Sequence, residues 1–139
     1  MSEAGSEGVR TPQPVMGFYD VPMWQTIAHG AMALQRCDDC GRFQYPPGPV
    51  CSHCLSPRLT WRPLSGRGTI LSWVIFHKGY LAAYPAPYNV IAVRLDEDVV
   101  LVSNLEAPLP EGDWIGRQVR MTYTTMADGF VLPRFVLAS

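Results

Sequence analysis

The sequence predicts a mostly β protein that consists of a short N-terminal helix, a metal-binding ribbon and a small five-stranded barrel. Three observations support this fold class. The 139 residues include 13 prolines and 12 glycines, which disfavour long helices and favour short strands joined by turns. All four cysteines lie in two Cys-x-x-Cys pairs, with ten residues between the pairs. From residue 64 onward, runs of β-branched and aromatic residues alternate with turn residues.

The composition argues against several classes of function. The net charge is −1 and the pI is about 6.3, so nothing electrostatic favours binding to nucleic acid or to an anionic membrane. No stretch approaches the roughly 20 apolar residues of a transmembrane helix, and the polar N-terminus lacks a signal-peptide pattern. We therefore expect a cytoplasmic protein, and a reducing compartment favours cysteines as metal ligands over disulfides.

The changes in composition along the chain predict four parts. These are a disordered tail over residues 1–17, an N-terminal helical unit over 18–33, a zinc ribbon over 34–62 and an OB-fold barrel over 63–139.

The helix is expected to span two to three turns. Asp20 can occupy its N-cap, Pro22 lies in its first turn, and Gly30 ends it. Trp24 and Ile27 fall on one face at helical spacing. Because so short a helix is marginal alone, these two side chains must bury against something. The pattern leaves open whether they bury against this chain or against a partner subunit.

The two cysteine pairs predict a closed metal site with four ligands: Cys37, Cys40, Cys51 and Cys54. Each pair directs two thiolates to one point, and two pairs supply the tetrahedron that a structural zinc ion takes. Iron accepts the same ligands in a rubredoxin-like ribbon, but no redox partner motif accompanies them, which favours Zn²⁺. His53 lies inside the second pair and is expected to be a bystander. Since a closed site has no position for water, we expect a structural metal that supplies folding free energy.

Five short strands predict the Greek-key barrel of the OB type. They are expected at residues 69–77, 88–96, 99–105, 118–124 and 130–137. Pro133, in the middle of the last strand, indicates an edge or a bulge.

The first barrel strand is apolar on both faces. Strict alternation places Ile70, Val74 and Phe76 on one face and Leu71, Trp73 and Ile75 on the other. One face fits the barrel interior, and the other must be covered by the ribbon, the helix or another protein. Trp73 therefore joins Trp24 and Ile27 as a candidate contact with a partner.

The sequence offers no catalytic constellation. The three histidines are scattered, no cysteine is left over as a nucleophile, and no phosphate loop or nucleophile elbow is present. The acidic run Asp96-Glu97-Asp98 reads as a solvated hairpin turn. An enzyme that acts alone is not expected.

Taken together, these parts resemble a bacterial and archaeal family of zinc-ribbon and OB-fold proteins associated with acyl-CoA enzymes. The resemblance covers residue 18 to the C-terminus. It rests on Phe18-Tyr19-Asp20, Trp24, Leu34-Gln35-Arg36-Cys37-x-x-Cys40-Gly41, Tyr45-Pro46-Pro47, Cys51-x-x-Cys54, Ser65-Gly66-x-Gly68 and Pro87-Tyr88 leading into Val93-x-Leu95-Asp96.

The resemblance implies a role rather than a chemistry. Members of this family are similar to small subunits, or fused domains, of thiolase-like enzymes, including thiolases and retro-aldolases that shorten steroid side chains. The large subunit supplies the nucleophile and base, and the small subunit helps to form the acyl-CoA site. The resemblance thus implies a hetero-oligomer with a thiolase-like large subunit and an acyl-CoA at the shared site.

The loop from His77 to Tyr88 is the candidate contact with that ligand or partner. Lys78, with an arginine near it in the fold, would meet the CoA phosphates, and the tyrosines would line the pantetheine path or a partner surface. The candidate residues are Arg67, His77, Lys78, Tyr80, Tyr84, Tyr88 and Arg94. The structural alternative is that the tyrosines anchor the loop on the barrel and that Lys78 is merely solvated.

Two other functions compete with the accessory subunit. Zinc ribbons and OB barrels both occur in proteins that bind single-stranded nucleic acid, although the near-neutral charge counts against this. A freestanding hydratase or transferase lacks candidate residues.

Overall fold

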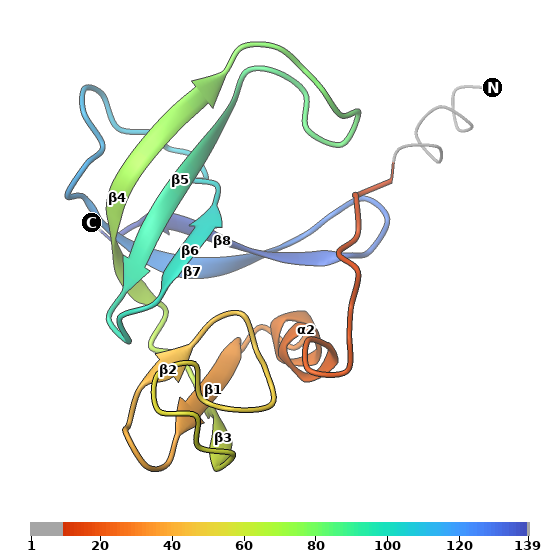
Figure 1. Cartoon of the computed structure of the whole chain (residues 1–139). Helices are drawn as coiled ribbons and strands as arrows, with labels where there is room; N and C mark the ends of the chain where they lie inside the picture. Colours follow the sequence, from red (N-terminus) through yellow and green to blue (C-terminus); the bar gives the residue numbers. More distant parts are fainter. Residues whose placement is uncertain (1–9, 139) are drawn as a thin grey trace.

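The computed structural model describes residues 10–138 as one helix followed by eight strands (Figure 1). The elements are α2 (Val21–Ala28), β1 (Ala33–Cys37), β2 (Phe43–Gln44), β3 (Leu59–Pro63), β4 (Arg67–Phe76), β5 (Tyr88–Leu95), β6 (Val100–Ser103), β7 (Gln118–Thr125) and β8 (Val131–Leu137). The predicted fold class, a mostly β chain with one short helix, is confirmed. The predicted tail over 1–17 falls outside the described residues in its first nine positions.

The N-terminal segment that is described runs beside the turn between β7 and β8. The backbone N–H of Thr11 donates to Asp128 at 2.7 Å, and its hydroxyl donates to the same carboxylate at 3.1 Å. These bonds hold the pKa of Asp128 below its ordinary value, the Thr11 N–H being the largest cause. Residues 10–17 form no helix or strand, yet Thr11 is buried against the hairpin.

Helix α2 begins and ends near the predicted residues. Asp20 occupies the N-cap, but its carboxylate accepts a hydrogen bond from the N–H of Gly17 (3.1 Å) rather than from the first turn. The chain leaves the helix through Gly30, whose φ of 75° lies in the left-handed region that glycine adopts without strain. The helix turns Met23 and Ile27 into the core.

The ribbon is a three-stranded sheet in the order β2-β1-β3. Strand β1 pairs antiparallel with both neighbours, with Gln35 opposite Gln44 on one side and opposite Trp61 on the other. Strand β3 was not among the predicted strands. It completes the ribbon and leads the chain directly into the barrel, which lies above α2 and the ribbon in Figure 1.

The barrel is a curled five-stranded sheet in the order β6-β5-β4-β7-β8. All neighbouring strands are antiparallel, and β4 and β5 extend together as a long hairpin (Figure 1). The sheet begins to close where Leu105 pairs in parallel with Phe135, beside the outer edges of β6 and β8. This is the arrangement expected of an OB fold.

A bulge in β4 corrects the predicted faces of this strand. The register with β5 shifts between Ile70 and Ser72, so Leu71 is an extra residue and the alternation reverses after it. Ile70 therefore shares the core-facing side with Trp73 and Ile75, whereas Val74 and Phe76 are exposed. Strict alternation from the sequence alone had grouped Ile70 with Val74 and Phe76.

One hydrophobic core joins the helix, the ribbon and the barrel. Its fully buried members include Ile27 of α2, Leu34 of β1, Ile91 of β5 and Phe135 of β8. Val119, Met121 and Tyr123 of β7 point inward, and the Tyr123 hydroxyl accepts a hydrogen bond from the N–H of Met32 at 2.7 Å. The three parts are therefore packed as one unit.

Candidate functional site

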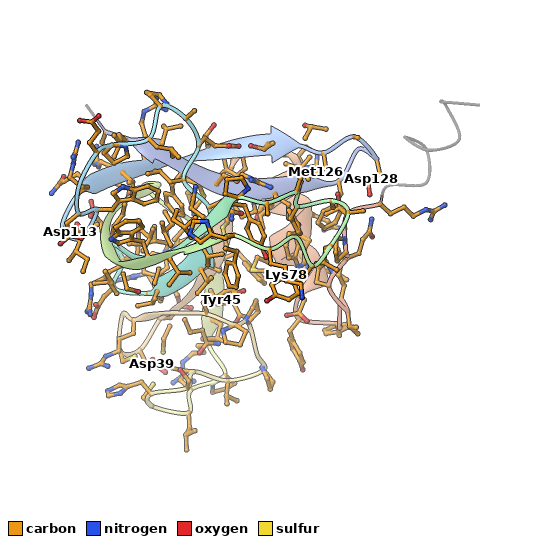
Figure 2. All side chains as sticks on the ribbon, turned by 90° about the horizontal axis from the view of Figure 1, so that it is seen from above. Asp39, Tyr45, Lys78, Asp113, Met126 and Asp128 are labelled. Carbon is orange, nitrogen blue, oxygen red and sulfur yellow. The ribbon has the colours of Figure 1, made fainter. Side chains whose placement is uncertain are left out.

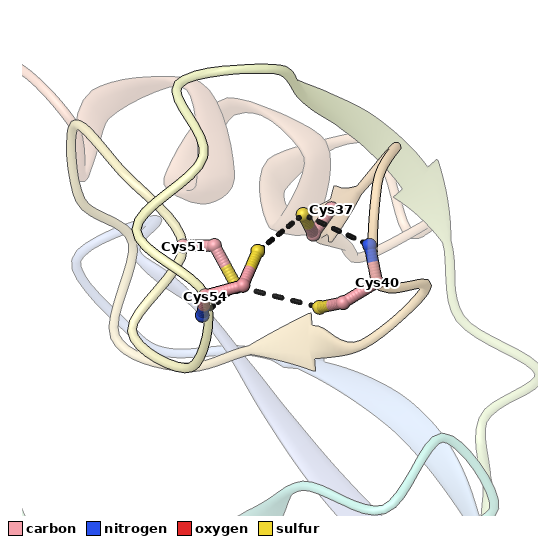
Figure 3. Close-up of side chains that lie close together, drawn as sticks. All are labelled: Cys37, Cys40, Cys51 and Cys54. Carbon is pink, nitrogen blue, oxygen red and sulfur yellow. Dashed lines mark hydrogen bonds between the residues drawn. The ribbon is translucent and has the colours of Figure 1, made fainter.

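The four cysteine side chains converge at one end of the ribbon (Figure 3). Cys37 precedes the first turn at the end of β1, and the second pair lies in the loop between β2 and β3. The Sγ atoms of Cys37 and Cys54 are 3.5 Å apart, those of Cys40 and Cys51 are 3.6 Å apart, and all four lie within 4.8 Å of one another. Four sulfurs at about 2.3 Å from a tetrahedral zinc ion lie about 3.8 Å from each other. The donor set and its spacing thus fit a metal.

Backbone N–H groups in the two turns favour the ionised sulfurs. The N–H of Cys40 donates to the Sγ of Cys37 at 3.4 Å and is the largest cause that lowers the pKa of Cys37 to about 6. The N–H groups of Cys54 (3.5 Å) and His53 (3.4 Å) donate to the Sγ of Cys51, whose pKa is also lowered. The thiolate is the form that binds metal, so the turns prepare Cys37 and Cys51 as ligands. The pKa values of Cys40 and Cys54 are raised instead, because burial and the neighbouring thiols outweigh the backbone hydrogen bonds that these two sulfurs accept.

The site is closed by its own ligands. Within residues 10–138, the four cysteines are the only group of three or more His, Cys, Asp or Glu side chains placed to hold a metal ion. His53 contributes its backbone N–H to Cys51. Four sulfur ligands leave no open coordination position, which is the arrangement of structural sites rather than catalytic ones.

An ion pair holds the two cysteine turns together from outside. Arg58 contacts the carboxylate of Asp39, which also accepts a hydrogen bond from the hydroxyl of Ser56. These contacts lower the pKa of Asp39, Arg58 being the largest cause. Asp39 lies in the first turn, and Ser56 and Arg58 follow the second, so the pair fixes one turn against the other.

Two buried glutamines support the ribbon and were not anticipated from the sequence. Gln44 donates to the side-chain oxygen of Gln35 at 2.7 Å, and its own oxygen accepts the N–H of Ser52 at 2.8 Å. Gln35 exchanges two hydrogen bonds with the backbone of Gly48. The pair thereby orders the proline-rich loop and the start of the second cysteine turn. The sequence did contain a signal for this pair, namely a polar residue at an inward position of β1 and of β2.

The predicted loop is an aromatic cluster at the free end of the β4–β5 hairpin. Phe76 stacks on Tyr88 with centroids 5.0 Å apart, Tyr84 lies 6.2 Å from Tyr88, and Tyr80 meets Phe76 edge-on at 6.3 Å. The Nζ of Lys78 lies 5.5 Å from the centroid of the Tyr80 ring. Tyr80 and Lys78 remain exposed. Figure 2, in which all side chains are drawn, labels Lys78 on this loop.

The structure does not bring Arg67 or Arg94 near Lys78, which corrects the prediction. Arg94 lies opposite Thr69 at the far end of the β4–β5 pair, on the order of 25–30 Å from Lys78 at about 3.3 Å per residue. Arg67 pairs with Asp96 (3.6 Å), and Arg94 pairs with Asp98 (3.1 Å). An antiparallel hairpin necessarily separates its open end from its connecting loop, so these arginines and the lysine form no single phosphate site.

The three candidate partner contacts pack inside this chain. Ile27 is only 1% exposed, Trp24 lies 5.3 Å from Phe130, and Trp73 stacks on a tryptophan of the 104–117 loop. The exposed apolar side chains of the sheet lie elsewhere, on the outer face of β4 and β6. They are Val74, Phe76, Val100 and Val102, with Tyr80 and Leu81 beside them in the loop.

A cavity of about 230 Å³ lies between α2 and the edges of β6 and β8. Met23, Trp24 and Ile27 line it from the helix, Tyr45 from the ribbon and Tyr84 from the long loop. The rest of the lining is Met32, Leu101–Asn104, Leu132, Pro133 and Phe135. No Asp, Glu, Lys, Arg or His borders this cavity among the described residues, so it favours uncharged and largely apolar groups.

The described residues provide no transmembrane segment. The helix that they contain is too short to cross a membrane.

Family comparisons cover most of the folded chain. Residues 24–60 match the family model "ChsH2, rubredoxin-like zinc ribbon domain", and residues 61–124 match "ChsH2, C-terminal OB-fold domain". The boundary between the two matches falls within β3, where the ribbon leads into the barrel.

Two curated relatives are longer than this chain. A "Probable enoyl-CoA hydratase alpha subunit" from Thermomonospora curvata is 29% identical over 89% of this chain and 39% of the relative. A "3-oxo-4,17-pregnadiene-20-carboxyl-CoA hydratase alpha subunit" from Mycobacterium tuberculosis is 30% identical over 76% of this chain and 33% of the relative. The chain thus spans 39% of the first relative and 33% of the second.

A solved structure matches nearly the whole fold. A chain of the "Ltp2-ChsH2(DUF35) aldolase" superposes with a TM-score of 0.83 at 28% identity, covering 91% of this chain and 100% of that one.

Proposed function

Because the chain belongs to the ChsH2 family of zinc-ribbon and OB-fold proteins, we propose that it is a non-catalytic accessory subunit of an acyl-CoA-processing enzyme. In this role it binds a thiolase-like large subunit and helps to form the acyl-CoA site, while the large subunit cleaves or forms the C–C bond. The match to an entire chain of the Ltp2-ChsH2(DUF35) aldolase is the observation that carries the proposal.

The chemistry of the described residues supports a non-catalytic role. The single convergent group of ligands is a closed four-sulfur site, and the cavity beside α2 is bordered by no acid, base or cationic side chain. The proposed metal is Zn²⁺, which would hold the two cysteine turns together and stabilise the ribbon against α2 and the barrel. Arg58, Arg67, Arg94 and Arg134 each lie within 4 Å of a carboxylate, which counts against a nucleic-acid groove.

Co-expression with a thiolase-like protein from the same genome tests the proposal. We expect one complex on size-exclusion chromatography, and a catalytic activity on an acyl-CoA that neither protein shows alone. A second acyl-CoA enzyme without a thiolase fold serves as the control and should elute separately. Two separate peaks, with the activity of the large subunit unchanged, would contradict the proposal.

The loop between β4 and β5 is the proposed contact with the ligand. Lys78→Ala should weaken CoA-ester binding to the complex about ten- to a hundredfold, the loss expected for one charge-assisted hydrogen bond. Arg94→Ala is the matched control, because it removes an exposed cation at the opposite end of the same hairpin. Equal effects of the two variants would remove the loop from the proposed site.

A further inference from the structure

The barrel carries an open seam between β6 and β8. The two strands begin to close as a parallel ladder at one point, where the N–H of Phe135 donates to the carbonyl of Asn104 (3.1 Å). The N–H of Glu106 donates in turn to the carbonyl of Phe135 (2.8 Å). A closed barrel would continue this ladder toward the start of both strands.

Pro133, two residues before Phe135, stops the ladder at its next step. In a parallel ladder alternate residues bond to the neighbour, so the residue at position 133 should donate its N–H to the carbonyl of Val102. Proline has no N–H, and the bond cannot form. The carbonyl of Pro133 accepts instead from the hydroxyl of Ser103, at 2.7 Å. The seam therefore opens because one backbone hydrogen is missing.

The outer edge of β6 is left with unpaired main-chain groups. The N–H of Leu95 donates to Val99, which fixes the alternation in the β5–β6 hairpin. Leu101 and Ser103 then exchange hydrogen bonds with β5, and the N–H and C=O groups of Val100 and Val102 point to the outer edge. In the part of the chain that is described, no strand pairs with this edge. The side chain of Val102 is 71% exposed.

The cavity beside α2 lies along the same edge. Val102 and Ser103 of β6 line it on one side, and Leu132 and Pro133 of β8 line it on the other. The open seam and this cavity together form a slot. Its β6 edge offers outward C=O and N–H groups in alternation, beside a space bordered by no charged side chain. The electrostatic complement of this pattern is another main chain, whose N–H and C=O groups carry the opposite partial charges.

We propose that the seam is a docking slot for one extended, uncharged segment of the large subunit. The segment would add to β6 as a further strand and direct alternate apolar side chains into the cavity. This inference rests on the proposed function, because it assigns the contact to that subunit.

The size of the slot selects a single segment over a second copy of this chain. Strand β6 has four residues and is about 13 Å long, which matches about four residues of partner strand. A stable dimer buries roughly 800 Å² on each partner, more than so short an edge supplies. The slot therefore serves as one element of a larger contact.

Amide hydrogen exchange on the complex of the co-expression experiment tests the slot. In the isolated chain, the amides of Val100 and Val102 should exchange rapidly, and binding of the thiolase-like subunit should protect them at least tenfold. A complex that forms without protecting these two amides would overturn the docking slot and leave the accessory role intact. If no complex forms, the proposed function fails, and the slot fails with it.

Two substitutions separate the seam from general stability. Val102→Pro removes only the outward N–H, because residue 102 does not donate to β5, and it should weaken the complex about five- to tenfold. Val102→Thr keeps the N–H and should bind within about twofold of the native chain. Pro133→Val restores the missing donor, closes the seam and should also weaken binding. Native affinity in both Val102→Pro and Pro133→Val would overturn the inference.

Discussion

The indole rings of Trp73 and Trp114 stack face to face, with their centroids 4.3 Å apart and their planes 14° from parallel. The Nε1 of Trp73 donates to the carboxylate of Asp113 at 3.0 Å, and Trp114 is only 4% exposed. The stack fastens the long loop between β6 and β7 onto β4. It exists because the bulge at Leu71 turns Trp73 to the core-facing side.

Truncating this stack should destabilise the whole chain. We expect Trp114→Leu to lower the free energy of unfolding by about 2–4 kcal/mol, since it removes a buried aromatic side chain and the stacking contact with Trp73. Denaturant unfolding followed by circular dichroism measures the change. Ile115→Asn alters a neighbouring side chain that is 57% exposed and should stay within about 0.5 kcal/mol of the native chain. Equal losses of unfolding free energy in the two variants would show that any substitution in the loop is destabilising, whether or not it removes the stack.

Asp113 should make a pH-dependent contribution to the free energy of unfolding. Its carboxylate accepts the N–H of Ile115 and then that of Trp73, and these bonds hold the pKa of Asp113 below its ordinary value. A lowered folded pKa stabilises the native state above the unfolded pKa, about 3.9, and this stability is lost as the pH falls through the folded pKa.

The difference in unfolding free energy between the native chain and the Asp113→Asn variant isolates that contribution. The difference in unfolding free energy should be constant from pH 7 to about 5 and should shrink at lower pH. Acid also protonates the cysteine ligands, but it does so in both chains, so the difference is the quantity to measure. A difference that is equal at pH 7 and pH 3 would refute the assignment.

Removal of the metal should unfold the ribbon. Cys37→Ser and Cys54→Ser each delete one of four sulfur ligands, and we expect insoluble or unfolded protein, because structural zinc supplies about 10 kcal/mol or more to such small domains. Metal analysis should find one Zn²⁺ per native chain. His53→Ala is the control and should retain it. Soluble cysteine variants that bind the partner without zinc would contradict the structural role.

The buried glutamine pair should also stabilise the ribbon, by less than the metal does. Gln35→Met leaves the amide of Gln44 and the N–H of Gly48 without their acceptor, so we expect a loss of about 2–4 kcal/mol in unfolding free energy. Gln25→Met, on an exposed position of α2, provides the same chemical change without buried partners. Thermal unfolding of the zinc-loaded proteins compares the two.

Replacing Gly68 by any residue with a side chain should destabilise the protein. A Cβ at this position would lie 2.6 Å from the Cγ1 of Val93 and 2.7 Å from the carbonyl oxygen of Arg94. Gly68→Ala should therefore force β4 away from β5 and cost about 1–3 kcal/mol of unfolding free energy. The nearest atoms to a Cβ at Gly48 are 4.0 Å away, so Gly48→Ala should be nearly neutral. A neutral Gly68→Ala would show that the strands shift without strain.

Local patterns in the sequence were sufficient to predict the metal site and most of the strands. Two Cys-x-x-Cys turns specify their own geometry, and the alternation of Val119, Met121 and Tyr123 specifies the inward face of β7. The bulge at Leu71 could not be predicted in this way, because it depends on how β4 pairs with β5 and β7. The same holds for the distance between Lys78 and Arg94, which only the register of the hairpin fixes.

Pro133 was visible in the sequence as a signal for a strand edge, but its consequence became clear only from the structure. A proline in a strand indicates an edge, but the identity of the opposite strand, β6, emerges only from the closure at Leu105 and Phe135. The two glutamines of the ribbon are a similar case. Their types are visible in the sequence, and their hydrogen bonds depend on a loop folded over them.

The missing hydrogen of Pro133 also bears on how the protein behaves before it meets a partner. A strand edge with unpaired N–H and C=O groups is a template for other β edges, and such edges promote aggregation. The isolated chain should therefore aggregate weakly at high concentration without forming a stable dimer, and co-expression with the large subunit should increase the soluble yield. Pro133→Val should improve the solubility of the isolated chain for the same reason that it impairs assembly. An unfinished barrel of this kind makes solubility depend on the supply of the partner.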